Sequence, residues 1–173
     1  ILVNDIGLKR IAEAAPFRFD GLKVAPYYGC QIVRPVFHFD DLEEPVFMDR
    51  LFEALGATVV DYPGKVRCCG GMLMMTAEDV ALDLNRNLLE DAAANEADVI
   101  VTACPMCQMN LEAYQPQINQ RFRKHFEIPV LYFTQLLGMA LGIASRELGI
   151  ESLLVPLGEV KLEKKALPAE VAA

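Results

Sequence analysis

Apolar residues recur along the chain at two alternating spacings, which predict short strands and longer helices in turn. Compact apolar runs of strand length, most of them bounded by Gly or Pro, lie at 22–28, 57–62, 98–103 and 129–133. Apolar positions at helical spacing predict helices at about 45–55, 76–97, 105–125 and 135–147. The pair Gln115-Pro116 predicts a kink or break in the third of these helices. Strands that alternate with helices indicate an α/β fold, a Rossmann-like open parallel sheet of about four strands with flanking helices.

The two ends of the chain have weaker patterns than the middle. Residues 1–15 are partly apolar at helical spacing, and Pro16 and Asp20-Gly21 predict a break after them. The segment from Pro156 onward is rich in Lys, Glu and Ala, which predicts a flexible tail or a contact arm in a complex. We therefore expect an N-terminal helix and linker at 1–21, a cysteine-rich domain at 22–155 and a flexible tail at 156–173.

Composition narrows the class of protein. The chain has 173 residues, of which 53% are hydrophobic, so it can bury a core of one domain and is not disordered. It contains neither an apolar run of membrane-spanning length nor the basic start and apolar run of a signal peptide. The net charge of −8 argues against a nucleic-acid partner. The first residue, Ile1, is consistent with a fragment or a processed chain.

Five cysteines form the most distinctive pattern in the sequence. They are Cys30, Cys68, Cys69, Cys104 and Cys107. They follow three different predicted strands, and the carboxyl ends of parallel strands meet at one edge of a sheet. We therefore expect these thiols to lie together. Their odd number and clustering argue against a secreted disulfide framework and favour a reducing cytoplasm.

The residue types at these positions favour a metal–sulfur group. Thiolates bind zinc and iron–sulfur clusters. The adjacent pair Cys68-Cys69 suits a wide, multi-metal group better than one tetrahedral ion, and Gly70-Gly71 lets backbone N–H groups approach an anion. Cys104 and Cys107 lie one turn apart at a predicted helix start, where the helix dipole favours thiolate. A zinc site, disulfides, simple core thiols or a thioredoxin-like redox pair are the alternatives.

Three basic residues near the cysteines are candidates for substrate chemistry. Arg34 or Arg67 could offset thiolate charge or hold an anionic group of a substrate. His38 could give a proton to a departing thiolate. The alternatives are a surface salt bridge for each arginine and no role for the histidine.

The order Cys, long gap, Cys-Cys-Gly, long gap, Cys-x-x-Cys resembles the cysteine-rich CCG domain of the B subunits of heterodisulfide reductases. The segments Tyr27-Tyr28-Gly29-Cys30, 103–110 and 128–133 resemble those B subunits as well. The likeness covers roughly residues 1–155. Because members of this family carry two such motifs and this chain has one, the resemblance implies the C-terminal half of a longer protein.

The resemblance also implies a function. The five cysteines would bind a non-cubane [4Fe-4S] cluster, and the protein would reduce a disulfide with electrons from partner iron–sulfur and flavin subunits. His38 and Arg34 are then the candidate catalytic residues. Related motifs occur in succinate, lactate and glycolate oxidoreductases, so an electron-transfer or anchor module is the alternative, and a structural zinc domain is a third interpretation.

Overall fold

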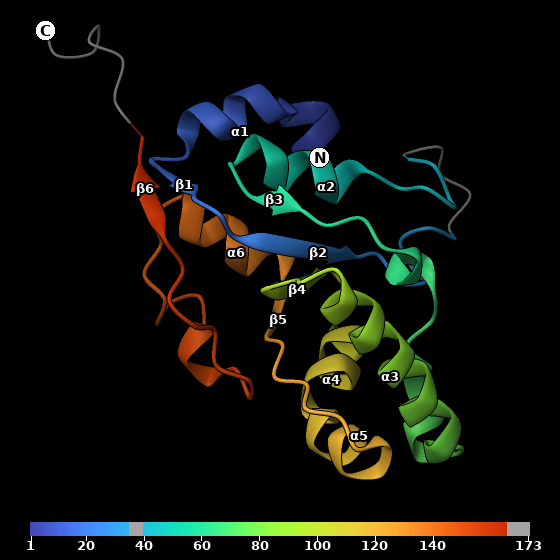
Figure 1. Cartoon of the computed structure of the whole chain (residues 1–173). Helices are drawn as coiled ribbons and strands as arrows, with labels where there is room; N and C mark the ends of the chain where they lie inside the picture. Colours follow the sequence, from blue (N-terminus) through green and yellow to red (C-terminus); the bar gives the residue numbers. More distant parts are fainter. Residues whose placement is uncertain (35–39, 166–173) are drawn as a thin grey trace, which may run out of the picture.

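A four-stranded parallel sheet forms the centre of the molecule (Figure 1). The computed structural model describes residues 1–34 and 40–165. The strands are β2 (Lys23–Tyr27), β3 (Thr58–Val59), β4 (Val99–Thr102) and β5 (Val130–Tyr132). They lie in the order β3-β2-β4-β5, and every neighbouring pair is parallel. The predicted α/β class and open parallel sheet are confirmed.

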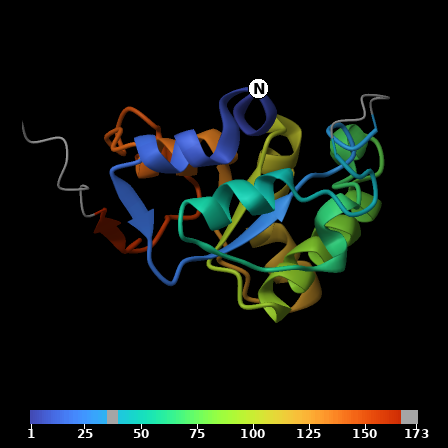
Figure 2. The ribbon, with the colours of Figure 1, turned by 90° about the horizontal axis from the view of Figure 1, so that it is seen from above.

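Helices cover both faces of this sheet. They are α1 (Leu8–Ala14), α2 (Phe47–Ala54), α3 (Glu78–Ala94), α4 (Pro105–Ala113), α5 (Gln115–Phe122) and α6 (Phe133–Ala140). Short helical segments lie at η1 (Leu2–Gly7), η2 (Pro63–Val66), η3 (Gly71–Met75) and η4 (Ile150–Ser152). Figure 2 looks onto the face that α1 and α2 cover, while α3, α4 and α5 lie below the sheet in Figure 1.

The strands divide the apolar interior into two cores. Successive side chains of a strand point to opposite faces of the sheet. Val99 and Val101 accordingly pack in the core under α1, α2 and α6, whereas Ile100 packs in the core under α3, α4 and α5. All three of these side chains are buried. This explains why β4 is a continuous apolar run rather than an alternating one.

The connections of the two central strands leave toward opposite faces. The chain after β2 leads to α2 on one face, and the chain after β4 leads to α4 on the other. Such a reversal between neighbouring parallel strands creates a topological switch point, and ligands of open α/β sheets bind at the carboxyl ends there. The fold therefore places a candidate site beyond Tyr27 and Thr102.

Residues near the two ends of the chain form a second, antiparallel sheet. Strand β1 (Phe17–Phe19) pairs with β6 (Leu162–Lys164), and the Phe19 side chain is buried. Strand β1 lies within the segment predicted as N-terminal helix and linker, 1–21, and β6 lies within the segment predicted as tail, 156–173. Each strand has three residues and its partner is distant in sequence, so no local pattern reveals the pairing. Residues 166–173 lie outside the described part of the chain.

Two helix boundaries show how local chemistry ends an element. The predicted break near Gln115-Pro116 is confirmed, because α4 ends and α5 begins around Tyr114. The helix predicted at 135–147 ends early, at Ala140. Gly142 adopts a φ of 82°, and the Ile143 N–H donates to the Gly138 carbonyl at 3.0 Å. This glycine-based C-cap stops α6.

A core truncation tests this architecture. Leu131 lies in β5 with none of its surface exposed, so Leu131→Ala should lower the free energy of unfolding by about 2–5 kcal/mol. Urea unfolding would measure the loss. Leu154 is 67% exposed, so Leu154→Ala is the matched control and should change stability by less than about 0.5 kcal/mol. Equal losses in both variants would contradict the described core.

Candidate metal centre

The five cysteines lie at the carboxyl-terminal edge of the sheet, as the sequence predicts. Cys30 follows β2, Cys68 and Cys69 follow η2, and Cys104 follows β4. The Lys65 carbonyl accepts hydrogen bonds from the N–H groups of Tyr28 and Gly29, at 2.9 and 3.1 Å. These two bonds tie the segment that carries Cys30 to the one that carries Cys68, and the two segments lie side by side in Figure 1.

Cys69 and Cys107 are in direct contact. Their Sγ atoms are 3.5 Å apart and both residues are buried. The hydrogen bond between the two thiols, and after it the N–H groups of Gly71 and Asn110 that donate to Cys69, lower the pKa of Cys69 to about 6. The same pairing, together with burial, raises the pKa of Cys107. Because the two sulfur atoms are in contact, the thiols of Cys69 and Cys107 titrate as a coupled pair.

The other three cysteines surround this pair. Burial and the neighbouring Cys68 sulfur raise the pKa of Cys30, and the Arg34 guanidinium partly offsets that effect. Cys104 is half-buried, forms the N-cap of α4 and also raises the pKa of Cys107. Cys68 is exposed. The sulfur atoms therefore range from solvent-accessible to fully enclosed along one edge.

Glycines bring backbone N–H groups close to the sulfur atoms. The Gly70 N–H donates to the Cys68 Sγ at 3.3 Å, and the Gly71 N–H donates to the Cys69 sulfur. Gly70 and Gly71 adopt φ values of 85° and 50°, which side chains rarely allow. A Cβ on Gly29, at φ 62°, would lie 3.2 Å from the Cys107 Sγ. This backbone favours thiolate ligands, so the residues present fit an anionic metal–sulfur group.

The described thiols do not form a compact set for one ion. Within residues 1–34 and 40–165, no group of three or more His, Cys, Asp or Glu side chains is arranged to hold a single metal ion. The thiols instead lie as neighbouring pairs along the edge. Their role as ligands stays a prediction.

The three basic candidates have different outcomes. Arg34 is exposed, lies close enough to Cys30 to lower the pKa of its thiol, and has no ion pair within the described residues. Arg67 is mostly exposed, and its guanidinium lies 3.8 Å from the Asp91 carboxylate. This contact favours the surface salt bridge over a role at the cysteines. His38 lies outside the described residues, so its predicted role is not tested.

Sequence reasoning missed four residues that line the site. They are Tyr27, Asn85, Asn110 and Tyr132. The Tyr27 hydroxyl donates to the Arg67 carbonyl at 2.7 Å, and burial and then the Cys69 charge raise the pKa of Tyr27. Burial, and after it the negative charge of the Cys104 sulfur, raise the pKa of Tyr132. Asn85 had a readable signal, because it is a polar residue within the apolar stripe of α3.

Family comparison agrees with the arrangement of the cysteines. Residues 24–112, about half of the chain, match the family described as cysteine-rich domain, and that range holds all five cysteines. The chain belongs to the cysteine-rich domain family. A cysteine-rich domain with this donor set suits iron–sulfur binding.

Several curated proteins are similar in sequence to this cysteine-rich domain. The B subunit of a ferredoxin:CoB-CoM heterodisulfide reductase of Methanosarcina mazei is 38% identical over 154 residues, covering 87% of this chain and 51% of the relative. The membrane anchor subunit of an 8-methylmenaquinol:fumarate reductase of Wolinella succinogenes is 38% identical over 131 residues, covering 75% and 46%. The chain therefore spans about half the length of these relatives.

A solved structure supports the fold of the domain. A protein of Helicobacter pylori superposes with a TM-score of 0.63 at 13% identity, over 87% of this chain and 28% of that one. At this identity the likeness concerns the fold alone. In the described part of the chain, no helix is both long and apolar enough to cross a membrane.

Oxidation of the cluster-free protein tests the Cys69–Cys107 contact. Diamide, which takes two electrons and two protons from a thiol pair, should form a Cys69–Cys107 disulfide first because these sulfur atoms are already in contact. Peptide mapping by mass spectrometry would identify the bond. Cys68→Ser should leave this product unchanged. A predominant Cys104–Cys107 disulfide would contradict the described geometry and favour the thioredoxin-like alternative.

Proposed function

We propose that this chain is the cysteine-rich domain of a heterodisulfide-reductase-like protein, in which all five cysteines bind one non-cubane [4Fe-4S] cluster. The whole protein reduces a disulfide with electrons from partner iron–sulfur and flavin subunits, and it works in the cytoplasm. The reaction consumes two electrons and two protons and yields two thiols. When bound, the cluster supplies the electrons one at a time.

The observation that carries this proposal is the gathering of five thiols from three segments of the chain at one edge of the sheet. Four thiolates satisfy an ordinary cubane cluster or a structural zinc ion. A fifth thiol, and the spread of the sulfur atoms in neighbouring pairs, support a larger group that different thiols reach at different metal atoms. Relatives named as heterodisulfide reductase subunits, at 38–40% identity, support the same interpretation.

The protein's own groups would perform three tasks at this site. Gly70 and Gly71 direct N–H groups at sulfur, which stabilises its negative charge without a cation. Buried Tyr27 and the partly buried Met74 of η3 pack in the same apolar cluster as Cys69, which would keep water from its sulfur. The exposed Cys68 marks the open side of the site, from which a substrate would approach.

Arg34 is the candidate for orienting the substrate on that open side. It lies beside Cys30, is exposed and has no anionic partner within the described residues. A guanidinium in that state can bind an anionic group of a disulfide through paired hydrogen bonds. His38 is four positions further along the chain and is proposed as the proton source for the departing thiolate.

A second candidate function rests on the fumarate reductase relative. That protein is named as an anchor subunit and is as similar over its matched region as the Methanosarcina mazei relative. In such a complex this domain would transfer electrons without meeting a disulfide. Assays of the full-length protein with its partner subunits, using a disulfide and fumarate as rival electron acceptors, separate the two functions.

Metal analysis tests the cofactor. Anaerobically purified protein should contain iron and acid-labile sulfide, about four of each per chain for a [4Fe-4S] group. Each single Cys→Ser change among the five should reduce both, whereas Met109→Ala, a change of an exposed residue on α4, should not. One zinc per chain without iron or sulfide would decide for the zinc alternative.

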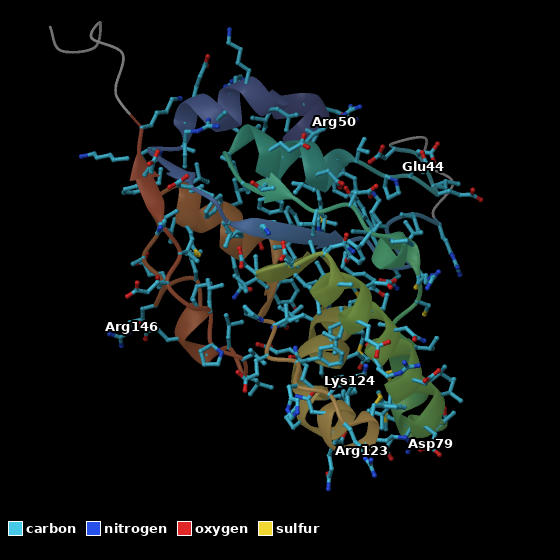
Figure 3. All side chains as sticks on the ribbon, in the orientation of Figure 1. Glu44, Arg50, Asp79, Arg123, Lys124 and Arg146 are labelled. Atoms are coloured by element: carbon cyan, nitrogen blue, oxygen red, sulfur yellow. The ribbon has the colours of Figure 1, made fainter. Side chains whose placement is uncertain are left out.

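Steady-state kinetics of the complex test the role of Arg34. Arg34→Gln should raise the KM for an anionic disulfide about ten- to 150-fold, because a charge-assisted hydrogen bond contributes roughly 1.5–3 kcal/mol. Iron content should stay unchanged. Arg50 is an exposed arginine on α2 (Figure 3), so Arg50→Gln is the matched control. An unchanged KM in Arg34→Gln would contradict the proposed role of this residue in binding the substrate.

A further inference from the structure

Two fully buried asparagines from different helices meet at Cys69. Asn85 comes from α3 and Asn110 from α4, and neither is exposed at all. The side-chain N–H groups of both donate to the Cys69 carbonyl, at 2.9 and 3.2 Å. The peptide of one candidate ligand is thus held from two directions.

The two asparagines differ in what else they contact. The Asn85 amide also donates to the Ala81 carbonyl at 2.7 Å, which fixes it to its own helix. The Asn110 amide instead donates to the Gly71 carbonyl at 3.0 Å and lies 3.7 Å from the Cys69 Sγ. Asn85 therefore holds the backbone only, whereas Asn110 spans the Cys-Cys-Gly-Gly segment and reaches the sulfur itself.

Packing alone does not account for this pair. The Oδ1 atoms of both asparagines are buried and have no hydrogen-bond partner within the described residues. An unpaired buried carbonyl oxygen lowers stability, and an apolar residue of the same volume would avoid that cost. The amide N–H groups of the two asparagines offset this loss of stability, because they donate hydrogen bonds to the carbonyl groups of Ala81, Cys69 and Gly71.

We propose that Asn85 and Asn110 are positioning residues for Cys69. Together they fix the Cys69 peptide so that its sulfur points to Cys107, and Asn110 additionally donates an N–H···S hydrogen bond to the Cys69 sulfur. The second part rests on the proposed iron–sulfur function. A hydrogen bond to a ligating sulfur stabilises the more negative, reduced state, so Asn110 would raise the reduction potential of the bound group.

Alkylation of the cluster-free protein tests the positioning. Asn85→Leu and Asn110→Leu should each increase the rate at which iodoacetamide modifies Cys69 at least fivefold, read by mass spectrometry of the Cys69 peptide. The matched control is Asn119→Leu. The side chain of Asn119, on α5, makes two comparable hydrogen bonds with the Phe126 backbone, both at 2.8 Å. An unchanged Cys69 rate in both variants, or an equal increase in the control, would overturn the proposal.

Redox titration of the anaerobically reconstituted protein tests the N–H···S bond. Asn110→Leu should shift the reduction equilibrium toward the oxidised form by about two- to tenfold, the range that one net hydrogen bond provides. Asn85→Leu should leave the equilibrium in place, because Asn85 does not reach the sulfur. Equal shifts in both variants, or none in Asn110→Leu, would overturn this assignment.

The results of these two experiments can be distinguished from a failure of the proposed function. If the wild-type protein binds no iron–sulfur group, the proposed function is wrong and the N–H···S role falls with it, while the alkylation rates still decide the positioning. If Asn110→Leu does not fold, Asn110→Ala removes the N–H donors without adding a charge beside the Cys69 sulfur. The same increase in Cys69 alkylation is expected from it, and no increase would overturn the proposal.

Discussion

The parallel pairing of β2 with β4 is the contact on which the rest of the structure depends. The two strands pair from Val24 opposite Val99 to Tyr27 opposite Thr102, and their connections leave toward opposite faces. This arrangement opens a gap at the sheet edge where loops from both faces meet. Cys30 and Cys104 occupy those two loops. The fixed register thus sets the spacing of the site before any ligand binds.

The helices complete the site from the lower face of the sheet. Asn85 on α3 and Asn110 on α4 reach the same peptide, and Gly70 packs against Ala81 of α3 so closely that a Cβ there would lie 3.3 Å from the Ala81 Cβ. The Cys68-Cys69 segment has no strand of its own at this point and takes its shape from these contacts. The most irregular backbone of the site is therefore the part most fully held by buried polar groups.

The sequence predicts the sheet and the thiols well because both have strong local signals. The strand at 98–103 is a continuous apolar run, and Cys-Cys-Gly-Gly and Cys-x-x-Cys are distinctive in themselves. The pairing of β1 with β6 and the contacts of Asn85 and Asn110 depend instead on segments far apart in the chain. Such contacts leave at most an indirect trace, such as one asparagine within an apolar helical stripe.

The origin of the five cysteines from three separate segments of the chain has a thermodynamic consequence. No short segment contains more than two of them, so any group that binds all five binds the folded domain and not the unfolded chain. Linkage then requires that the bound group raise the free energy of unfolding, and that its loss lower the melting temperature. Occupancy of this edge and resistance to proteolysis should consequently rise and fall together.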